Sequence, residues 1–219
     1  MPGPDPKDAV VIIGAGGHAK VVIDLLNSSG VPIFGLTDVD GSPRRILGAP
    51  VLGNDEILPS LFTQGVRHVF VALGDNQLRL AMGARVHALG FDLVNAISPR
   101  ATISPSARLG RGVAIMAGAV INADAQIGDL AIINTGAGVD HDTFVGRGSH
   151  VGPGAAVAGG VHIGSGALLG VGSSVAPGCS IGEGAIIGAG ACVIDDIAPD
   201  LVAVGVPARA KGEIQKGRP

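Results

Sequence analysis

Aliphatic residues recur at every sixth position through the second half of the chain, between Ile103 and Val193. The positions are Ile103, Leu109, Ile115, Ile121, Ile127, Ile133, Val139, Val145, Val151, Val157, Ile163, Leu169, Val175, Ile181, Ile187 and Val193. Four residues after each of them up to Ile187, the chain carries Ala, Val, Thr, Ser or Cys. Glycine often follows the aliphatic residue, as in Ile127-Gly128, and supplies turn conformations that other residues resist.

A six-residue unit with one inward aliphatic side chain, one inward small side chain and a turn predicts one face of a parallel β-helix. Such units close one coil in groups of three, so the repeat predicts about five coils. The aliphatic side chains fill the interior, and any ligand must therefore bind outside. The last coil needs a cap over its exposed strand edge.

The first hundred residues follow a different pattern, in which apolar strands alternate with helical segments. The expected strands are 10–13, 33–36, 66–73 and 93–97, and the expected helices are 18–27, 55–62 and 77–89. Alternation at this spacing indicates a parallel sheet. The sequence thus predicts an α/β domain with a small Rossmann-like sheet over residues 1–98, then an all-β parallel β-helix over residues 99–219.

Composition narrows the function classes. The net charge of -3 offers no basic surface for nucleic acid. Glycine or a polar residue interrupts every long apolar stretch, well short of the roughly 20 residues that cross a bilayer. The start of the chain does not look like a signal peptide, so we expect a cytoplasmic protein without membrane association. Cys179 and Cys192 fall within the repeat and are expected to be buried structural thiols.

A glycine-rich loop follows the first expected strand and opens the first expected helix. Its candidate ligand-binding residues are Gly14, Gly16, Gly17, His18 and Lys20. Backbone N–H groups at a helix N-terminus favour phosphate, so the loop suits the diphosphate of a nucleotide-linked sugar. A tight turn without a ligand and an NAD site remain alternatives.

Polar residues follow the next two strands of the expected sheet. Asp38 lies beyond the second strand and is a candidate to bind ribose hydroxyls or base N–H groups, with a solvated turn acid as the alternative. Gly74, Asn76 and Arg79 follow the third strand at the same expected edge and are further candidate substrate contacts. A helix-start role for Asn76 is equally compatible with the sequence.

Within the repeat, one hexad carries a histidine between two carboxylates, Asp140-His141-Asp142. His141 occupies neither the aliphatic nor the small inward position, so its side chain should project outward. An imidazole near neutral pKa can take a proton from an attacking amine or hydroxyl, and an adjacent carboxylate can raise its basicity. His141 is therefore the candidate general base, with Asp142 beside it.

The Gly-x-Gly-Gly-His loop, the hexads with Asn134-Thr135 and His141-Asp142, and the Gly-Val-Pro-Ala-Arg end of the repeat together resemble hexapeptide-repeat nucleotide-sugar acetyltransferases. These include the N-acetyltransferases of the bacillosamine and perosamine pathways and the sialic acid O-acetyltransferases. The resemblance implies a left-handed β-helix capped by residues 194–209, a homotrimer, and a role in polysaccharide biosynthesis. It implies that acetyl-CoA donates the acetyl group to the 4-amino group of a nucleotide-linked amino-deoxysugar, GDP- or UDP-linked.

The resemblance also assigns residues in the repeat. It implies that His141 is the base, that Asp142 tunes it, and that Asn134 contacts substrate. The acetyl-CoA contacts that it implies are His150, Gly159, Val171 and Ala189. No metal is implied.

Two other functions remain open from the sequence, besides transfer to oxygen rather than nitrogen. A trimeric metal-dependent hydratase of the carbonic anhydrase type would use His141, His150 and His162, although their spacing does not place them on one face of a six-residue repeat. A non-catalytic β-solenoid scaffold would bind no acetyl-CoA. His162 has no role in the acetyltransferase prediction.

Overall fold

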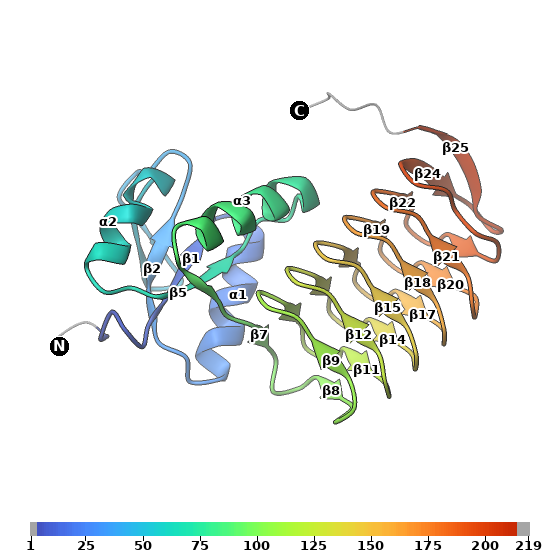
Figure 1. Cartoon of the computed structure of the whole chain (residues 1–219), viewed down its shortest axis with the longest axis horizontal. Helices are drawn as coiled ribbons and strands as arrows, with labels where there is room; N and C mark the ends of the chain where they lie inside the picture. The colour runs from blue at the N-terminus through green and yellow to red at the C-terminus, as the bar shows by residue number, and fades with distance from the viewer. Residues whose placement is uncertain (1–3, 214–219) are drawn as a thin grey trace. The chain divides into compact units, whose positions relative to one another are not determined.

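The computed structural model describes residues 4–213. The chain divides into two compact units, Met1–Pro99 and Arg100–Pro219, both drawn in Figure 1. The outer ends of the two predicted domains, residues 1–3 and 214–219, lie outside the described residues. Within residues 4–213, the helices fall in the first unit and the second consists of strands and turns.

The N-terminal unit is an α/β fold with the strand order β3-β4-β2-β1-β5-β6. The central strand β1 pairs in parallel with β2 on one side and β5 on the other. The elements are β1 (Val10–Ile13), α1 (Gly17–Ser28), β2 (Ile33–Thr37), β3 (Arg45–Ile46), β4 (Ala49–Gly53), a 3-10 helix η1 (Asp55–Ile57), α2 (Leu58–Thr63), β5 (His68–Val71), α3 (Asn76–Ala88), β6 (Asp92–Leu93) and β7 (Ala96–Ile97). The predicted parallel α/β sheet is confirmed.

Strand β1 is apolar along its whole length because neighbouring structure buries all of it. Its residues are at most 1% exposed, which is typical of a parallel strand covered on both faces. Helix α1 buries Val22, Ile23 and Leu26, which share one helix face. Helix α1 therefore covers part of the core of this unit, and β1 lies at its centre.

The structure corrects three details of the predicted elements. The expected helix 55–62 is divided into η1, whose N-terminus Asn54 caps, and α2. The expected strand 93–97 is divided into β6 and β7. The short hairpin β3–β4 was not predicted, because its turn is Leu47-Gly48 rather than a typical Asn-Gly or Asp-Gly pair.

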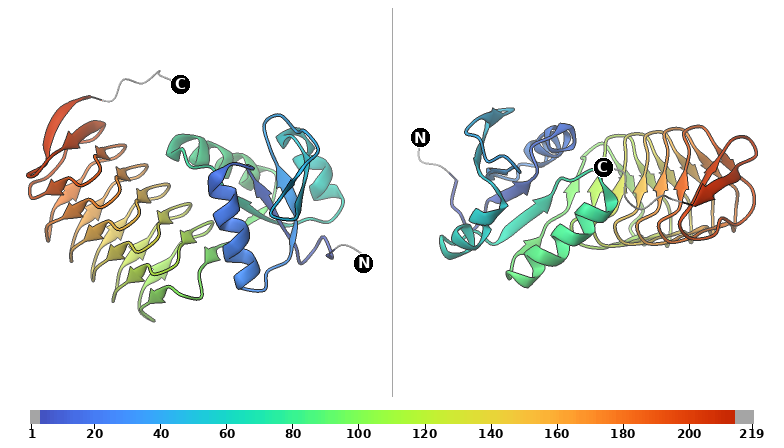
Figure 2. Two further views of the ribbon diagram at one scale, coloured as in Figure 1. Left: turned by 180° about the vertical axis from the view of Figure 1, so that it is seen from behind. Right: turned by 90° about the horizontal axis from the view of Figure 1, so that it is seen from above.

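The C-terminal unit is a parallel β-helix built from two-residue strands. Its strands are β8 (Thr102–Ile103), β9 (Arg108–Leu109), β10 (Ala114–Ile115), β11 (Val120–Ile121), β12 (Gln126–Ile127), β13 (Ile132–Ile133), β14 (Gly138–Val139), β15 (Phe144–Val145), β16 (His150–Val151), β17 (Ala156–Val157), β18 (His162–Ile163), β19 (Leu168–Leu169), β20 (Ser174–Val175), β21 (Ser180–Ile181), β22 (Ile186–Ile187) and β23 (Cys192–Val193). They form three parallel sheets, and the coils stack one on another in Figure 2. The fold predicted from the six-residue period is confirmed.

The interior of the solenoid consists of the two columns that the repeat predicts. Strands one coil apart pair in register, as Val139 does with Val157. From Ile115 to Val193 the aliphatic positions are at most 3% exposed. Two polar residues at the small position have partners, because the Thr143 and Ser149 hydroxyls donate to backbone carbonyls. The Ser173 hydroxyl at the same position is buried without a hydrogen-bond partner among the described residues.

The final coil is closed by two further strands. β24 (Leu201–Val204) continues one sheet in parallel beyond β22, and β25 (Arg209–Glu213) pairs with it in the antiparallel direction. The predicted cap therefore lies where the solenoid edge needs it.

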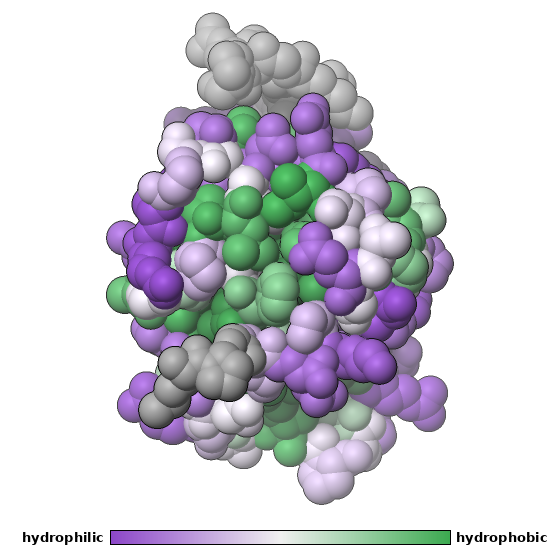
Figure 3. Space-filling model, turned by 90° about the vertical axis from the view of Figure 1, so that its left-hand side faces the viewer, coloured by the Kyte–Doolittle hydropathy of each residue, from purple (hydrophilic) through white to green (hydrophobic). Residues whose placement is uncertain are grey.

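No helix within residues 4–213 combines the length and apolar content that crossing a bilayer would require. The space-filling view in Figure 3 shows apolar residues gathered among hydrophilic ones on the face drawn there. Several large apolar side chains of the N-terminal unit are exposed, and they are Val21, Val39, Leu47 and Leu78.

Candidate active site

The carboxyl ends of three neighbouring strands meet at one edge of the N-terminal sheet. Gly14–Gly17 follows β1, Asp38 follows β2, and Gly74 follows β5. Because β1 lies between β2 and β5, the strand order reverses at this edge, which is where open α/β sheets bind ligands. The predicted nucleotide-binding segments therefore share one edge.

The glycines of the loop after β1 have two different structural roles. Gly14 has φ +104°, and a Cβ atom there would lie 3.0 Å from the Ala72 carbonyl oxygen, so the close approach of the chain after β5 requires glycine. Gly16 and Gly17 instead face open space, and no side chain caps the start of α1. Lys20 is exposed in the first turn. The uncapped N–H groups and the helix dipole suit a phosphate.

His18 is mostly buried beside this loop and is neutral at physiological pH. Burial, assisted by the charge of Arg79, lowers the pKa of His18 to about 4. Its Nε2 atom is buried without a hydrogen-bond partner among residues 4–213. His18 can therefore offer a neutral imidazole, but not a cation, to a ligand.

Arg79 is 1% exposed, and its guanidinium organises the loop after β5. It donates to the carbonyl oxygens of Leu73 and Gly74 and to Oδ1 of Asn76. Burial lowers its pKa to about 10, with Asp75 opposing the shift, so it remains a cation near neutral pH. Sequence reasoning placed Arg79 among substrate contacts; the structure gives it a buried position that shapes the loop.

Asp38 is held by its own loop. Its Oδ1 accepts from the backbone N–H of Val39, and its Oδ2 pairs with Arg44, which also pairs with Asp40. A ligand that used this carboxylate would have to compete with Arg44. Arg44 was missed from the sequence because nothing in the pattern joins it to Asp38.

Two exposed apolar side chains at the same edge were also missed. Val39, beside Asp38, is 86% exposed, and Leu78, in the first turn of α3, is 62% exposed. Apolar groups at the rim of a polar site can pack against a flat ring. Their signal in the sequence is only their position next to predicted binding loops.

The backbone holds His141 on an edge of the solenoid, in the turn between β14 and β15. The Asp142 N–H donates to the Ala123 carbonyl of the coil before, and the Gly160 N–H donates to the His141 carbonyl from the coil after. The imidazole projects outward as predicted, with a 60% exposed side chain. The turn is therefore fixed while the ring remains accessible.

Both flanking carboxylates act on the imidazole. Asp142 Oδ2 lies 2.8 Å from His141 Nδ1, and Asp140 Oδ1 accepts from the His141 backbone N–H at 2.8 Å. The hydrogen bond that His141 donates to Asp142, followed by the charge of Asp140, raises the pKa of His141. The contact at Nδ1 leaves Nε2 as the nitrogen that can take a proton from a substrate.

Asp142 adopts a backbone conformation that the repeat normally gives to glycine. Its φ is +57°, whereas Gly136, Gly148 and Gly154 occupy the same turn position elsewhere in the solenoid. A left-handed conformation costs a residue with a side chain about 1 kcal/mol, although Asp tolerates it better than most. The strained turn places the carboxylate beside the ring.

Gly159 lies one coil beyond His141, against its ring. A Cβ atom at Gly159 would be 2.6 Å from both Cε1 and Nε2 of His141. Glycine is therefore required if the imidazole is to keep this position. The sequence could have indicated the contact, because three hexads make one coil.

His150 and Asn134 form a second cluster, on another edge. Asn134 Oδ1 accepts the Thr135 N–H, which turns Nδ2 toward His150 Nε2 at 2.9 Å. Val171 and Ala189 continue this edge on later coils, where the Gly190 N–H donates to the Val171 carbonyl. Asn134 thus lies with the predicted acetyl-CoA contact His150.

The two edges border the sheet that contains β11, β14 and β17. Asn134 precedes β14 along the chain and His141 follows it, so the width of this sheet separates the clusters within one chain. A groove of about 320 Å³ lies on the sheet and includes Asn122, Asp140 and Ala158. Of the predicted acetyl-CoA contacts, only Gly159 lies beside His141.

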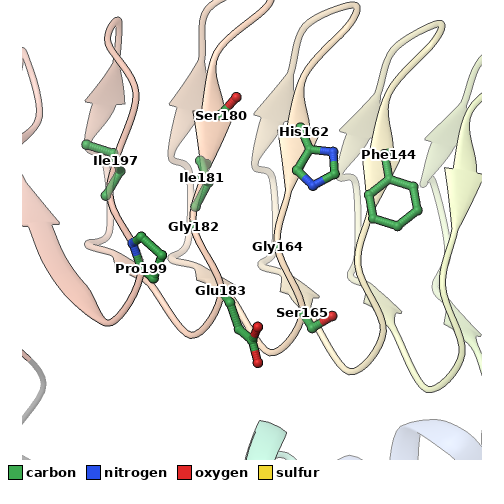
Figure 4. Close-up of a pocket in the computed structure, with 10 residues that line it drawn as sticks. All are labelled: Phe144, His162, Gly164, Ser165, Ser180, Ile181, Gly182, Glu183, Ile197 and Pro199. Carbon is green, nitrogen blue, oxygen red and sulfur yellow. The ribbon is translucent and has the colours of Figure 1, made fainter.

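His162 lies on a third sheet and stacks on Phe144, with ring centroids 4.8 Å apart. Figure 4 shows both rings at a cavity of about 400 Å³ that Glu183 also lines. His141 thus lies on an edge of the solenoid, whereas His150 and His162 lie in strands of two different sheets. Within residues 4–213, no three His, Cys, Asp or Glu side chains form a group suited to a metal ion.

Family models match both units. The PglD N-terminal domain model matches residues 9–86, and the model for bacterial transferase hexapeptide (six repeats) matches residues 160–195. A variant of perosamine N-acetyltransferase from Caulobacter crescentus, solved with CoA and GDP-perosamine, is 54% identical, with a TM-score of 0.92 over 94% of this chain and 97% of that one. In that variant a histidine has been replaced by asparagine, and in a second solved variant a histidine has been replaced by alanine.

More distant relatives have the same architecture. The acetyltransferase domain of PglB from Neisseria gonorrhoeae FA1090, solved with acetyl coenzyme A, is 36% identical, with a TM-score of 0.87 over 93% of this chain and 99% of that one. UDP-N-acetylbacillosamine N-acetyltransferase from Bacillus subtilis (strain 168) is 36% identical over 116 residues, 49% of this chain. The match spans 51% of that curated relative's own length.

Proposed function

The chain belongs to the hexapeptide-repeat nucleotide-sugar N-acetyltransferases, and we propose that it transfers an acetyl group from acetyl-CoA to the 4-amino group of a nucleotide-linked amino-deoxysugar. GDP-perosamine is the preferred acceptor, because the 54% identical relative was solved with that ligand and CoA. The observation that carries the mechanism is the outward imidazole of His141, bound at Nδ1 by Asp142.

The reaction proceeds by direct transfer. The sugar amine attacks the thioester carbonyl while His141 Nε2 accepts a proton from nitrogen. Asp142 holds the ring and stabilises the imidazolium that forms. The tetrahedral intermediate then collapses, the C–S bond breaks, and the coenzyme A thiolate leaves. No covalent enzyme intermediate is needed.

The edge of the N-terminal sheet binds the nucleotide. The open loop at Gly16 and Gly17 receives the diphosphate on the uncapped start of α1, with Lys20 adding positive charge. Gly14 allows the chain after β5 to approach closely. The neutral imidazole of His18 lies beside the same loop. The Asp38 carboxylate accepts hydrogen bonds from the ribose or the base once the ligand has displaced Arg44 from it. The apolar side chains of Val39 and Leu78 pack against the base.

The loop after β5 completes this site. Gly74 and Asn76 border the ligand, and Arg79 holds them in place from its buried position. The hydrogen bonds from Arg79 keep the loop organised before the ligand arrives, which lowers the entropy cost of binding.

Acetyl-CoA lies along the edge that carries Asn134, His150, Val171 and Ala189, with its thioester reaching Gly159 and His141. Within one chain a sheet separates these clusters. A neighbouring copy brings the His150 edge of one chain to the His141 edge of the next, so the active form is a homotrimer with shared sites. Its substrates, acetyl-CoA and a nucleotide sugar, fit a cytoplasmic enzyme of polysaccharide biosynthesis.

The test is a thiol-release assay with acetyl-CoA and a panel of GDP-, UDP- and dTDP-linked amino sugars. We expect release to depend on the acceptor and GDP-perosamine to have the highest kcat/KM. Sedimentation of the same protein should give three times the monomer mass. Failure of every amino sugar to stimulate thiol release would reject the proposed activity, and an active monomer would reject the shared site.

A further inference from the structure

The sheet made of β9, β12, β15, β18 and β21 carries a column of outward side chains, one from each coil. Phe144, His162 and Ser180 are neighbours in this column, because β15, β18 and β21 pair in register. The rings of Phe144 and His162 stack with centroids 4.8 Å apart and planes 12° from parallel, which matches the spacing of paired strands. Ser180, in the next coil, is too short to continue the stack. One face of the exposed His162 ring is therefore accessible to another planar group.

The cavity of about 400 Å³ extends from His162 past Ser180 to Ile197 and Pro199 (Figure 4). Ile197 pairs with Ile181, so it lies one coil beyond Ser180 and two coils beyond His162. Two strand spacings are about 9.6 Å, which leaves room for one ring between the His162 imidazole and an aliphatic wall. We call this space the ring slot.

The polar lining of the ring slot favours a ligand that donates hydrogen bonds. The Glu183 carboxylate is exposed at its margin, and no group among residues 4–213 donates a hydrogen bond to it. The hydroxyls of Ser165 and Ser180 complete the polar lining with His162, and no Lys or Arg side chain lines the cavity. The ring slot therefore suits a neutral ring with donors on its edge, and it does not suit a phosphate.

Guanine meets these requirements among planar biological groups. Its N1–H and N2–H donors lie side by side on one edge and match the two oxygens of a carboxylate in a charge-assisted pair. Adenine offers its amino donor beside a ring acceptor, and a carboxylate, which only accepts, repels that acceptor. Both bases stack on aromatic rings, so the contact with Glu183 decides between them.

We propose that the ring slot binds a guanine base, stacked on His162, with its N1–H and N2–H groups donating to Glu183. The sugar and phosphate of the nucleotide extend into solvent. The site uses neither the His141 turn nor the glycine loop after β1, so it is a second nucleotide site and goes beyond the proposed function. His162, which has no role in the proposed acetyl transfer, supplies the stacking surface.

The test is photolabelling of the full-length protein with 8-azido-GMP, followed by mapping of the labelled peptides by mass spectrometry. We expect label on peptides between Phe144 and Pro199, and GMP should protect them at a concentration at least about 10-fold lower than AMP. The map separates this site from the N-terminal sheet edge, where the proposed function also places a nucleotide. Competition by GMP and by GDP-perosamine distinguishes a free nucleotide from a nucleotide sugar as the source of the base.

Variants of the column test each contact. His162→Ala removes the stacking surface and should raise the protecting concentration of GMP about 10-fold or more. Glu183→Gln should reduce the preference for GMP over AMP to below about 3-fold. Ser180→Phe should continue the ring column, fill the slot and abolish labelling there. Gln126→Ala, on the other side of Phe144 in the same column, should leave labelling unchanged.

Absence of label from the solenoid of the wild-type protein would overturn the inference, as would equal protection by GMP and AMP. A Ser180→Phe protein that is labelled as strongly as the wild type would also overturn it. If a neighbouring subunit covers Phe144 and His162 in a crystal structure of the assembly, the slot does not exist and the inference fails. Thiol release tests acetyl transfer separately, so the two proposals can fail independently.

Discussion

The turn that carries His141 and the turn one coil before it have the same backbone and different chemistry. Both follow a strand of the same sheet, β14 and β11, and both place an aspartate in the left-handed region, at φ +57° for Asp142 and +58° for Asp124. The earlier turn has Ala123 where the later one has His141. The repeat thus provides a uniform frame, and the side chains placed on it decide where chemistry occurs.

The coils on either side extend this contrast. In the coil before, Asn122 donates a hydrogen bond to Asp140, a residue 18 positions later. In the coil after, Gly159 leaves the space that the His141 ring occupies. The active turn therefore depends on three successive coils, and each contribution can be removed separately.

Replacing the imidazole should have the largest effect. We expect His141→Ala to lower kcat at least about 100-fold in the thiol-release assay, because a general base contributes that much or more. Ala123→Ser, in the equivalent position one coil earlier, should leave kcat unchanged. A variant that kept wild-type kcat and pH dependence would remove His141 from the mechanism.

Filling the space that Gly159 leaves beside the His141 ring should have the second largest effect on kcat. A methyl group in Gly159→Ala would displace the imidazole, and we expect kcat to fall about 10- to 100-fold with little change in the free energy of unfolding. In Gly146→Ala the new Cβ would lie 2.5 Å from the Ser165 backbone nitrogen, so that variant should lose stability instead. Chemical denaturation and kinetics on both variants measure the contrast; a Gly159→Ala enzyme with full activity contradicts it.

Removing the carboxylate of Asp142, whose backbone is left-handed, should change the pH dependence of kcat/KM. Asp142 raises the pKa of His141, so the base becomes neutral only above the ordinary histidine value of about 6.5. Asp142→Asn should move the acidic limb of kcat/KM to lower pH and reduce its plateau. Asp124→Asn, with the same backbone conformation and no histidine beside it, should leave the profile unchanged. An unshifted limb in Asp142→Asn would show that Asp142 does not tune the base.

Replacing Thr143, the inward-facing residue of the turn, should have the smallest effect on the protein. Thr143 donates its hydroxyl to the Ala158 carbonyl at 3.0 Å, whereas the equivalent residue one coil earlier is Ala125. Thr143→Ala should cost about 1 kcal/mol of unfolding free energy and leave the acidic limb in place. Ala125→Ser, which adds a hydroxyl at the equivalent position, tests whether the coil accepts one there. A large loss of activity in Thr143→Ala would mean that the turn itself had moved.

Much of the architecture could be read from the pattern, because each hexad repeats the same requirement. A slip of one residue would expose the aliphatic column, and register was therefore predictable over the whole solenoid. The N-terminal elements were less exact at η1 and at the β3–β4 hairpin, where short segments lack a strong period. The outward position of His141 followed from the repeat alone.

The sequence by itself determined the coil, the parallel sheet and the turn that presents His141, because the spacing of buried apolar side chains specifies them. Only the tertiary structure decided which polar side chains meet. It buried Arg79, paired Asp38 with Arg44, joined Asn134 to His150 and laid the His141 ring on Gly159. Such contacts depend on side-chain direction and on the stacking of coils, and local hydrophobicity contains neither.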